Sequence, residues 1–219
     1  MTESRPRART RTRLPAAERR ASILAAATEV FSETGYQRGK VSDIAKRIGV
    51  SEPVVFQNFG SKAALYRAAL DHVTDSVSAL LHQAADAGRP VPEVLATFLD
   101  PAHMDHFHQP GSHGFLFADA AALAHDPDLG GALRQVHQHF GTALAELLRR
   151  GQSAGEIRDD VDPETAAWWL VSLLAGRSFR AAVVPERDAV EAELTRMALG
   201  ALLPEGSAGG GPRPSRGSA

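Results

Sequence analysis

Four neighbouring side chains in this sequence suit the edges of DNA bases. The spacing of apolar residues predicts a short helix that begins at Ser51, with Pro53 and Gln57 one turn apart on its outer side and Val54 and Phe56 beside them. Glutamine can form two hydrogen bonds with adenine, and Pro, Val or Phe can contact the methyl group of thymine. The outer side carries no charge, so it suits a DNA groove better than bulk water. The alternative is a helical hairpin buried in a larger bundle.

The predicted DNA contacts extend to the flanking residues. The segment itself comprises Ser51, Glu52, Pro53, Val54, Val55, Phe56, Gln57, Asn58 and Phe59, of which Val55 and Phe59 face inward. All three lysines of the chain lie between residues 40 and 62. Lysine and hydroxyl side chains supply phosphate contacts, which carry affinity without sequence preference. We predict such contacts, with Val41 beside them, at Lys40, Ser42, Lys46 and Lys62.

The first 13 residues form a basic segment in which arginine alternates with small or polar residues. No apolar run is present there that could pack or act as a secretory signal, so we expect disorder. Two interpretations stay open: an arm that follows DNA phosphates or enters the minor groove, and a solubilising tail. The arginines are Arg5, Arg7, Arg9, Arg11 and Arg13.

Two other patterns suggest different chemistry. Residues 151–155 match the G-x-S-x-G motif of serine hydrolases, with Ser153 as nucleophile. That motif needs a strand before the serine, whereas here a Leu- and Arg-rich helical pattern precedes it, so a helix end is favoured. Histidines cluster between His103 and His113, but their spacing is irregular and Pro110 indicates a loop. We therefore predict neither an enzyme nor a metal site, and no cofactor.

Composition and charge favour a DNA-binding protein of one large or two small domains. The chain has 219 residues, of which 43% are hydrophobic, and no cysteine. No apolar run is long enough to span a membrane, and a cytoplasmic location is expected. Counting along the sequence, residues 1–62 hold 12 Lys and Arg against 6 Asp and Glu, a net charge of +6, and the remainder carries −8, which sums to the total of −2. The basic end suits a polyanion.

Two short helices joined by a tight turn must position the base-reading residues. Apolar residues from Val41 to Ile48 recur at helical spacing, and Gly49 supplies the left-handed residue that ends a helix. Ser51 can cap the next helix, and Pro53 is tolerated in its first turn. This arrangement is typical of DNA-binding helix-turn-helix units.

The rest of the chain also has helical patterns, so the predicted fold class is all-α. Gly35 is expected to end the first helix, and Ser61, Asp128 and Asp162 to cap later ones. The helix that begins at Asp162 is apolar nearly all round, which predicts burial on more than one side. Besides the helix-turn-helix, the predicted helices cover residues 15–32, 61–87, 92–99, 115–125, 128–148, 162–182 and 185–203.

Residues 19–70 resemble the N-terminal domain of the tetracycline-repressor (TetR) family of transcriptional regulators. At two places the chain departs from the family pattern: Gly39 and Lys40 stand where Thr or Ser is usual, and Phe56 where Tyr is usual. Hydroxyl groups that would contact phosphates are thereby lost, although Lys40 can supply a contact of its own. The matching residues are Ile23, Leu24, Ala26, Ala27, Phe31, Gly35, Tyr36, Asp43, Ile44, Ala45, Gly49, Val50, Ser51, Phe56, Phe59, Ser61, Lys62 and Leu65.

The resemblance implies a homodimeric, ligand-responsive repressor that binds a palindromic operator in double-stranded DNA. Its expected parts are a basic arm (1–13), a helix-turn-helix domain (14–61), a helical effector-binding and dimerisation domain (62–204) and a disordered tail (205–219). An unidentified small-molecule effector would enter an apolar pocket formed by Phe98, Met104, Phe107, Phe115 and Trp168. The last two helices resemble the family's dimer interface, here with Trp169, Leu173, Leu194 and Met197.

Two alternatives from other classes remain open at this point. One is a DNA-binding protein that needs no effector and has no preferred site, which would bind through phosphates alone. The other is the serine hydrolase centred on Ser153. Operator reading by a single short helix is weak, which favours the dimer over simple burial of the last two helices within one subunit.

Overall fold

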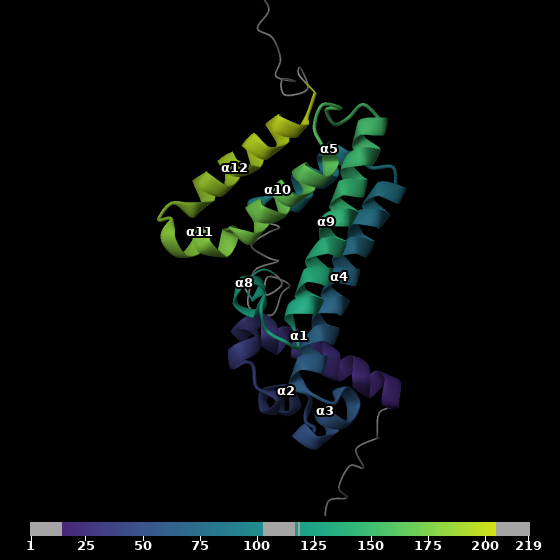
Figure 1. The fold of residues 1–219 in the computed structure, drawn as a ribbon, viewed down its shortest axis with the longest axis vertical. Helices are drawn as coiled ribbons and strands as arrows, with labels where there is room; N and C mark the ends of the chain where they lie inside the picture. Colours follow the sequence, from purple (N-terminus) through teal and green to yellow (C-terminus); the bar gives the residue numbers. More distant parts are fainter. Residues whose placement is uncertain (1–14, 103–116, 118, 205–219) are drawn as a thin grey trace, which may run out of the picture.

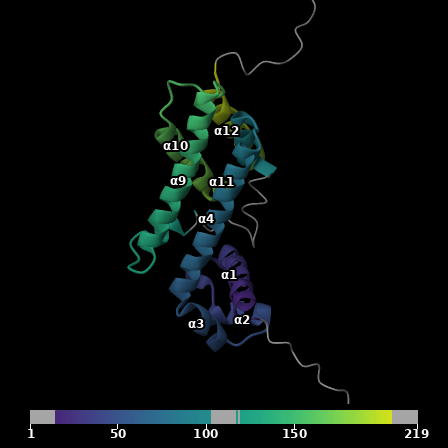
Figure 2. The ribbon, with the colours of Figure 1, turned by 90° about the vertical axis from the view of Figure 1, so that its right-hand side faces the viewer.

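The computed structural model describes residues 15–102, 117 and 119–204, and every regular element in those ranges is an α-helix. This confirms the predicted all-α fold class. The helices form an elongated molecule with a small head at one end and a larger body at the other (Figures 1 and 2). Within the described ranges, no helix combines the length and the apolar character that crossing a membrane requires.

The head contains α1 (Ala16–Arg38), α2 (Val41–Ile48) and α3 (Glu52–Phe59). α2 and α3 form the predicted helix-turn-helix, and Gly49 between them has φ 67° and ψ 36°, in the left-handed region that glycine adopts without strain. Pro53 lies in the first turn of α3, where its missing N–H removes no helical hydrogen bond. The three helices and the start of α4 share one apolar core, which includes Ile23, Phe31, Ile44, Val55, Leu65 and Tyr66.

The body is built around two long helices, α4 and α9, which lie side by side (Figures 1 and 2). α10 packs on α9, while α5 contacts α4, α9 and α12. α4 belongs to both parts of the molecule, because its first turns pack on α1 and its later turns on α9. The helices of the body are α4 (Lys62–Asp86), α5 (Val91–Leu99), α8 (Ala120–Leu123), α9 (Gly130–Ser153), α10 (Pro163–Ala175), α11 (Arg177–Val183) and α12 (Arg187–Leu202).

A buried ionic cluster joins α11 to α12 and to the end of α5. The Glu191 carboxylate contacts Arg177 at 3.1 Å and Arg180 at 2.7 Å. Arg177 also donates to the carbonyl oxygen of Pro101 at 2.9 Å. Glu191 and Arg177 are almost fully buried, so each charge depends on its partners for the solvation that water no longer provides.

The ends of the helices confirm some predicted caps and correct others. Ser61 and Asp162 cap α4 and α10 as predicted, since each side chain accepts a hydrogen bond from the amide three residues further on, at 3.0 and 2.9 Å. Ser51 occupies the N-cap position of α3, but its hydroxyl makes no capping hydrogen bond, so that prediction was wrong. Asp128 does not cap α9 either. Asp126 accepts from two amides of that turn, each at 2.9 Å.

Two further helix boundaries were predicted, and one of them differs in the structure. Gly35 has φ 71° and ψ 173°, which are not helical values, so the regular part of α1 ends there as predicted, and a short helical segment continues beyond the kink to Arg38. The single helix predicted over 162–182 is divided into α10 and α11 at Gly176. Of the helix predicted over 115–125, α8 is the part that falls within a continuous described range.

Candidate nucleic-acid interface

The outer face of α3 is open to solvent at the end of the molecule that points away from the body (Figure 1). Pro53 and Gln57 are exposed, Phe56 is 41% exposed, and Val54 is half-buried. These are the four side chains that sequence spacing places together for reading bases. The observed arrangement keeps them on one uncharged surface that is free of covering elements in the described structure.

The inner face of α3 holds it against the rest of the head. Val55 and Phe59 are 1% and 8% exposed, and Val41 at the start of α2 is 7% exposed. These three side chains therefore belong to the core, and their part in any DNA contact is to position the helices. Ser51 and Glu52 lie exposed beside the outer face.

The end of α3 is fixed by a contact from α1 that sequence reasoning missed. The Arg20 guanidinium lies 4.0 Å from the centre of the Phe59 ring and donates a hydrogen bond to the carbonyl oxygen of Asn58. The Asn58 amide donates to the carbonyl oxygen of Val54 at 2.7 Å, so this side chain is folded back on its own helix. In this structure Asn58 is thus turned away from the direction of a base contact.

The four predicted phosphate-binding residues lie in different surroundings. Lys40, at the N-cap of α2, and Lys46, in its last turn, are exposed, and Ser42 is half-buried. Lys62 instead donates to the carbonyl oxygen of Gln37 at 3.3 Å, and its ammonium lies 4.5 Å from the centre of the Tyr36 ring. Burial lowers the pKa of Lys62, and the negative charge of Asp119 opposes part of that shift.

Asp119 is a second residue that sequence reasoning missed. Its carboxylate accepts hydrogen bonds from the Tyr36 amide and from the Tyr66 hydroxyl, both at 2.7 Å. These partners are 83 and 53 residues away in the chain, so no local pattern could have indicated the contact. Burial, with the charge of Asp119 as a smaller cause, raises the pKa of Tyr66 and keeps its hydroxyl protonated.

An aromatic cluster lies inside the body, next to α4. Phe98 packs on Phe140 with ring centres 5.9 Å apart. Phe117 lies 6.1 Å from Phe140 and 5.6 Å from His137. A cavity with a volume of about 10 Å³ lies beside these rings. It is lined by Phe117, His137 and Phe140, together with Thr74, Val77 and Val136.

His137 presents an unsatisfied polar atom in this region. Its Nδ1 lies 2.7 Å from the carbonyl oxygen of Leu133, which only accepts, so Nδ1 carries the proton. In the neutral ring Nε2 is then an acceptor, and it is buried without a hydrogen-bond partner in the described structure. A buried acceptor without a partner is costly, so a ligand that donates a hydrogen bond would be favoured there.

Trp168, which was also predicted as a ligand contact, is not part of this cluster. Trp168 is 45% exposed and lies at the junction of α9 and α10, beside Gly141. It is therefore not brought together with Phe98, because α10 turns it toward the surface. Outside the described residues lie Met104, Phe107 and Phe115, as does the histidine cluster.

An apolar surface runs along α10, α11 and α12. Among the residues predicted to form a dimer interface, Trp169 and Met197 are 42% and 54% exposed, and Leu173 and Leu194 are half-buried. The helix predicted over 162–182 was expected to be buried on more than one side, but within one subunit Trp168 and Trp169 of α10 and Phe179 of α11 are exposed. Exposed apolar side chains on these helices include Trp168, Trp169, Phe179, Val183, Val190 and Met197.

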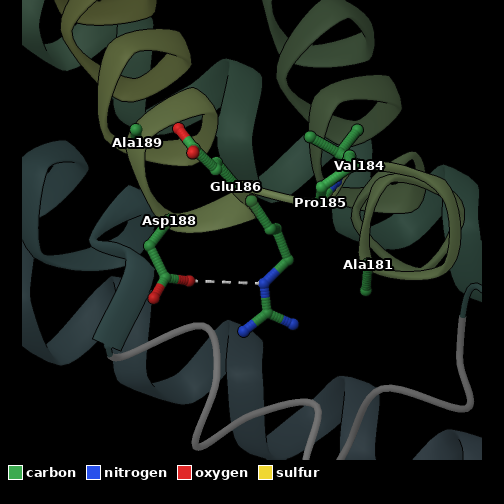
Figure 3. A pocket seen from close by; sticks show the side chains of 7 residues that line it. Ala181, Val184, Pro185, Glu186, Asp188 and Ala189 are labelled. Atoms are coloured by element: carbon green, nitrogen blue, oxygen red, sulfur yellow. Dashed lines mark hydrogen bonds and ion pairs between the residues drawn. The ribbon is translucent and has the colours of Figure 1, made fainter.

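Two hollows on the surface of the body lie away from the head. One, of about 480 Å³, opens at the turn between α11 and α12, where an ion pair of 3.5 Å joins Arg187 to Asp188 (Figure 3). The other, of about 160 Å³, is an apolar groove between α4 and α5 that includes Leu80 and Phe98. Neither brings together the acid, base and nucleophile that a hydrolytic site requires.

The surroundings of Ser153 differ from those of a serine nucleophile. Ser153 is in the last turn of α9, and its hydroxyl donates to the carbonyl oxygen of Arg149 at 3.0 Å. The element before it is a 24-residue helix rather than a strand. Across the described ranges, no group of three or more His, Cys, Asp or Glu side chains is placed to hold a metal ion.

Comparison with known proteins agrees with this geometry. The family described as "Bacterial regulatory proteins, tetR family" matches residues 23–69, and "Tetracyclin repressor-like, C-terminal domain" matches residues 95–198. The HTH-type transcriptional repressor Rv3405c of Mycobacterium tuberculosis is 33% identical over 154 residues, which cover 64% of this chain and 80% of that protein. The chain belongs to the TetR family. It is therefore a DNA-binding transcriptional regulator of the helix-turn-helix type.

The chain is also similar to a second regulator in sequence and to a solved structure in fold. The HTH-type transcriptional activator FasR of Mycolicibacterium smegmatis is 44% identical over 142 residues, which cover 63% of this chain and 62% of FasR. A TetR-family regulator from Agrobacterium tumefaciens shares the fold, with a TM-score of 0.74 at 16% identity, over 87% of this chain and all of that structure. This chain thus spans less than two thirds of FasR.

Proposed function

We propose that this TetR-family protein is a homodimeric repressor that binds a palindromic operator and is released by a small-molecule effector. The observation that carries the proposal is the outer face of α3, where Pro53 and Gln57 are exposed while Val55 and Phe59 of the same helix are buried. Such a division is what a recognition helix needs, because one side must pack and the other must enter the major groove.

The proposed roles follow from exposure and chemistry. Gln57 reads an adenine, and Pro53, Val54 and Phe56 contact thymine methyl groups beside it. Exposed Lys40 and Lys46, with Ser42, hold the phosphates on either side. Lys62 contributes at the rim of this surface, where its ammonium is tied to the end of α1.

Dimer formation is supported by the apolar surface on α10–α12. Exposed large apolar side chains cluster on these helices, whereas solvent-facing apolar surface is normally scattered. Pairing through Trp169 and Met197 would bury that surface and present two recognition helices about 34–36 Å apart, the separation of half-sites one helical turn apart.

An effector site is supported by the aromatic cluster of Phe98, Phe117 and Phe140. His137 adds a buried acceptor, which suits an apolar molecule with one hydrogen-bond donor. A ligand with different affinities for two conformations shifts the equilibrium between them, which is how such a site would control the spacing of the heads.

Repression rather than activation is favoured by the extent of the matches. The similarity to the repressor Rv3405c covers 80% of that protein, while the match to the activator FasR covers 62% of it. A repressor also needs no surface for contacting RNA polymerase. Transcription from a promoter that carries the selected site should fall when this protein is added.

Selection of bound sequences from a random DNA pool tests the proposal. A two-fold symmetric consensus, with half-site centres one helical turn apart, is the expected result. Binding to all sequences alike, with a salt dependence but no preferred site, would instead support an architectural DNA-binding protein that needs no effector.

A further inference from the structure

Asp119 connects the body to the head through two hydrogen bonds. Its Oδ2 accepts from the Tyr36 amide of α1 and from the Tyr66 hydroxyl of α4, each at 2.7 Å. The bend at Gly35 makes this contact possible, because it opens the helical ladder and leaves the Tyr36 amide to an external acceptor. A methyl group on Gly35 would lie 3.0 Å from Oδ1, so the carboxylate is seated directly against the bend.

The carboxylate binds to a well-packed part of the head. Tyr66 is fully buried, and its ring lies 4.9 Å from that of Phe31 at 85° and 4.9 Å from that of Tyr36. The Lys62 ammonium lies 4.5 Å from the centre of the Tyr36 ring. Movement of Asp119 therefore acts on the end of α1 and the start of α4, the two helices that support the helix-turn-helix.

The same short segment reaches the cavity of the body. Phe117, two residues before Asp119, packs on His137 and Phe140 of α9 and lines the cavity of about 10 Å³. That volume holds about one water molecule, so a larger molecule must displace part of the wall. The other described wall residues belong to the long helices α4 and α9.

We propose that Asp119 is a latch that holds the head in a fixed orientation on the body, and that a molecule entering beside Phe117 releases it. Phe117 and Asp119 are two residues apart, so at most about 7 Å of chain separates the wall of the cavity from the latch. The latch rests on the proposed function, because it supplies the link between effector site and DNA. With the latch closed, both heads of a dimer keep their spacing. Release leaves each head intact but lets the spacing vary.

The first experiment replaces the carboxylate and measures two properties of the full-length protein. Asp119→Ala removes both hydrogen bonds, Asp119→Asn keeps an oxygen that can accept them, and Tyr66→Phe removes one while keeping the ring. Asp128→Ala is the matched control, because the Asp128 charge also acts on Tyr36 without a hydrogen bond to it. The measurements are hydrogen exchange of the Tyr36 amide, and affinity for the selected palindrome and for a single half-site.

The latch predicts a specific pattern of results. In Asp119→Ala the Tyr36 amide exchanges faster, and affinity for the palindrome falls by about tenfold, within the usual range of coupling between sites. Affinity for the half-site stays within about twofold of the wild-type value. Asp119→Asn and Tyr66→Phe give smaller effects in the same direction, and Asp128→Ala gives none.

A second experiment tests the link to the cavity without a known effector. Phe117→Trp overfills the cavity, so it imitates an occupied site and should accelerate exchange at Tyr36 as Asp119→Ala does. An unchanged Tyr36 amide in Phe117→Trp overturns the link between cavity and latch.

Other outcomes separate the latch from the proposed function. Equal losses on palindrome and half-site in Asp119→Ala would overturn the latch, since Asp119 would then support only the fold of the head. An unchanged palindrome affinity with faster exchange would overturn it as well. Hydrogen exchange is measured without DNA, so it tests the latch even if the protein binds no operator. An unchanged exchange rate of the Tyr36 amide in Asp119→Ala would overturn the latch. Failure to bind an operator would by itself refute only the proposed function.

Discussion

Arg47 of α2 binds Glu33 of α1 through two parallel hydrogen bonds, each 2.9 Å long. A second carboxylate, that of Glu29, lies 3.1 Å from the same guanidinium. Fork-shaped contacts of this kind fix geometry as well as energy. They tie the first helix of the helix-turn-helix to α1 through side chains that are partly exposed. The hydrogen bond from Arg47 lowers the pKa of Glu33 below its usual value of 4.5.

Acid should therefore weaken the head through Glu33. Because the folded-state pKa is lowered, the ion pair stabilises the fold above about pH 4.5 and this contribution is lost as pH falls through the folded-state pKa. Thermal unfolding of Glu33→Gln between pH 3 and 7 should show a loss below about 1 kcal/mol at neutral pH, since the pair is partly exposed, and a smaller loss in acid. Glu18→Gln, on the same helix, is the control. A loss that grows toward acid would contradict this assignment.

Gln57 and Lys46 should affect DNA binding in different ways. Gln57→Ala removes a base contact, so it should cost about 1–3 kcal/mol at one base position in each half-site and relax specificity there. Lys46→Ala removes a phosphate contact, so it should weaken all sequences alike and reduce the salt dependence. Competition binding with single-base operator variants separates the two effects. Identical profiles for both variants would show that the roles are wrongly assigned.

Gly35 should tolerate substitution less well than Gly88. Both have positive φ, 71° and 69°, but a methyl group on Gly88 meets nothing within 4 Å, whereas one on Gly35 meets Asp119. Gly88→Ala should destabilise by about 1 kcal/mol and Gly35→Ala by about 2–3 kcal/mol, from backbone strain and the contact together. Denaturant unfolding measures both. If the contact with Asp119 contributes, the loss of stability caused by Gly35→Ala should be smaller in a protein that also carries Asp119→Ala. Strictly additive losses of stability for the two substitutions would show that the contact does not contribute.

A charge on α12 should convert the proposed dimer into a monomer. Met197 and Leu80 are similarly exposed, at 54% and 58%, but only Met197 lies on the apolar surface of α10–α12. Met197→Glu places an unpaired charge in the proposed interface, while Leu80→Glu places one on α4, outside that interface. Light scattering after gel filtration should give the mass of one chain for Met197→Glu and of two for Leu80→Glu. A dimer in both cases would place the interface on another surface.

Removing the charge of Glu191 should destabilise the body strongly. Its carboxylate is shared by two guanidinium groups in a buried setting, so Glu191→Gln leaves them uncompensated at a cost of about 3–5 kcal/mol. Glu193→Gln is the matched control, since its pair with Arg196 is exposed. Calorimetry measures the melting temperature and the free energy of unfolding of both variants. Equal melting temperatures for the two variants would mean that water reaches the cluster.

The helix-turn-helix could be predicted because its signals are local. Gly49, Pro53 and the apolar spacing of α2 and α3 all lie within 20 residues of one another, and the structure agrees with each of them. The cap at Ser51 was not realised, although the residue occupies the expected position. Hydroxyl caps depend on side-chain rotation, which spacing does not determine.

The links between distant elements could not be predicted in the same way. Asp119, Arg20 and Arg47 each bind partners that are 14 or more residues away, and a single sequence contains no signal for such pairing. The end of the regular helix at Gly35 was predicted, because the signal of a glycine is local. The short segment beyond it was not predicted, since its Tyr36 amide is held by the distant Asp119.

The continuity of α4 limits how this protein can be recombined with its relatives. Leu65 and Tyr66 complete the core of the head, while Val73 and Val77 of the same helix belong to the core of the body. A graft at residues 61–62 would give the transplanted head a foreign supporting wall. Chimeric regulators should therefore be joined after about Leu70, and a graft that moves α1 and Tyr66 must also supply the acidic residue that meets them.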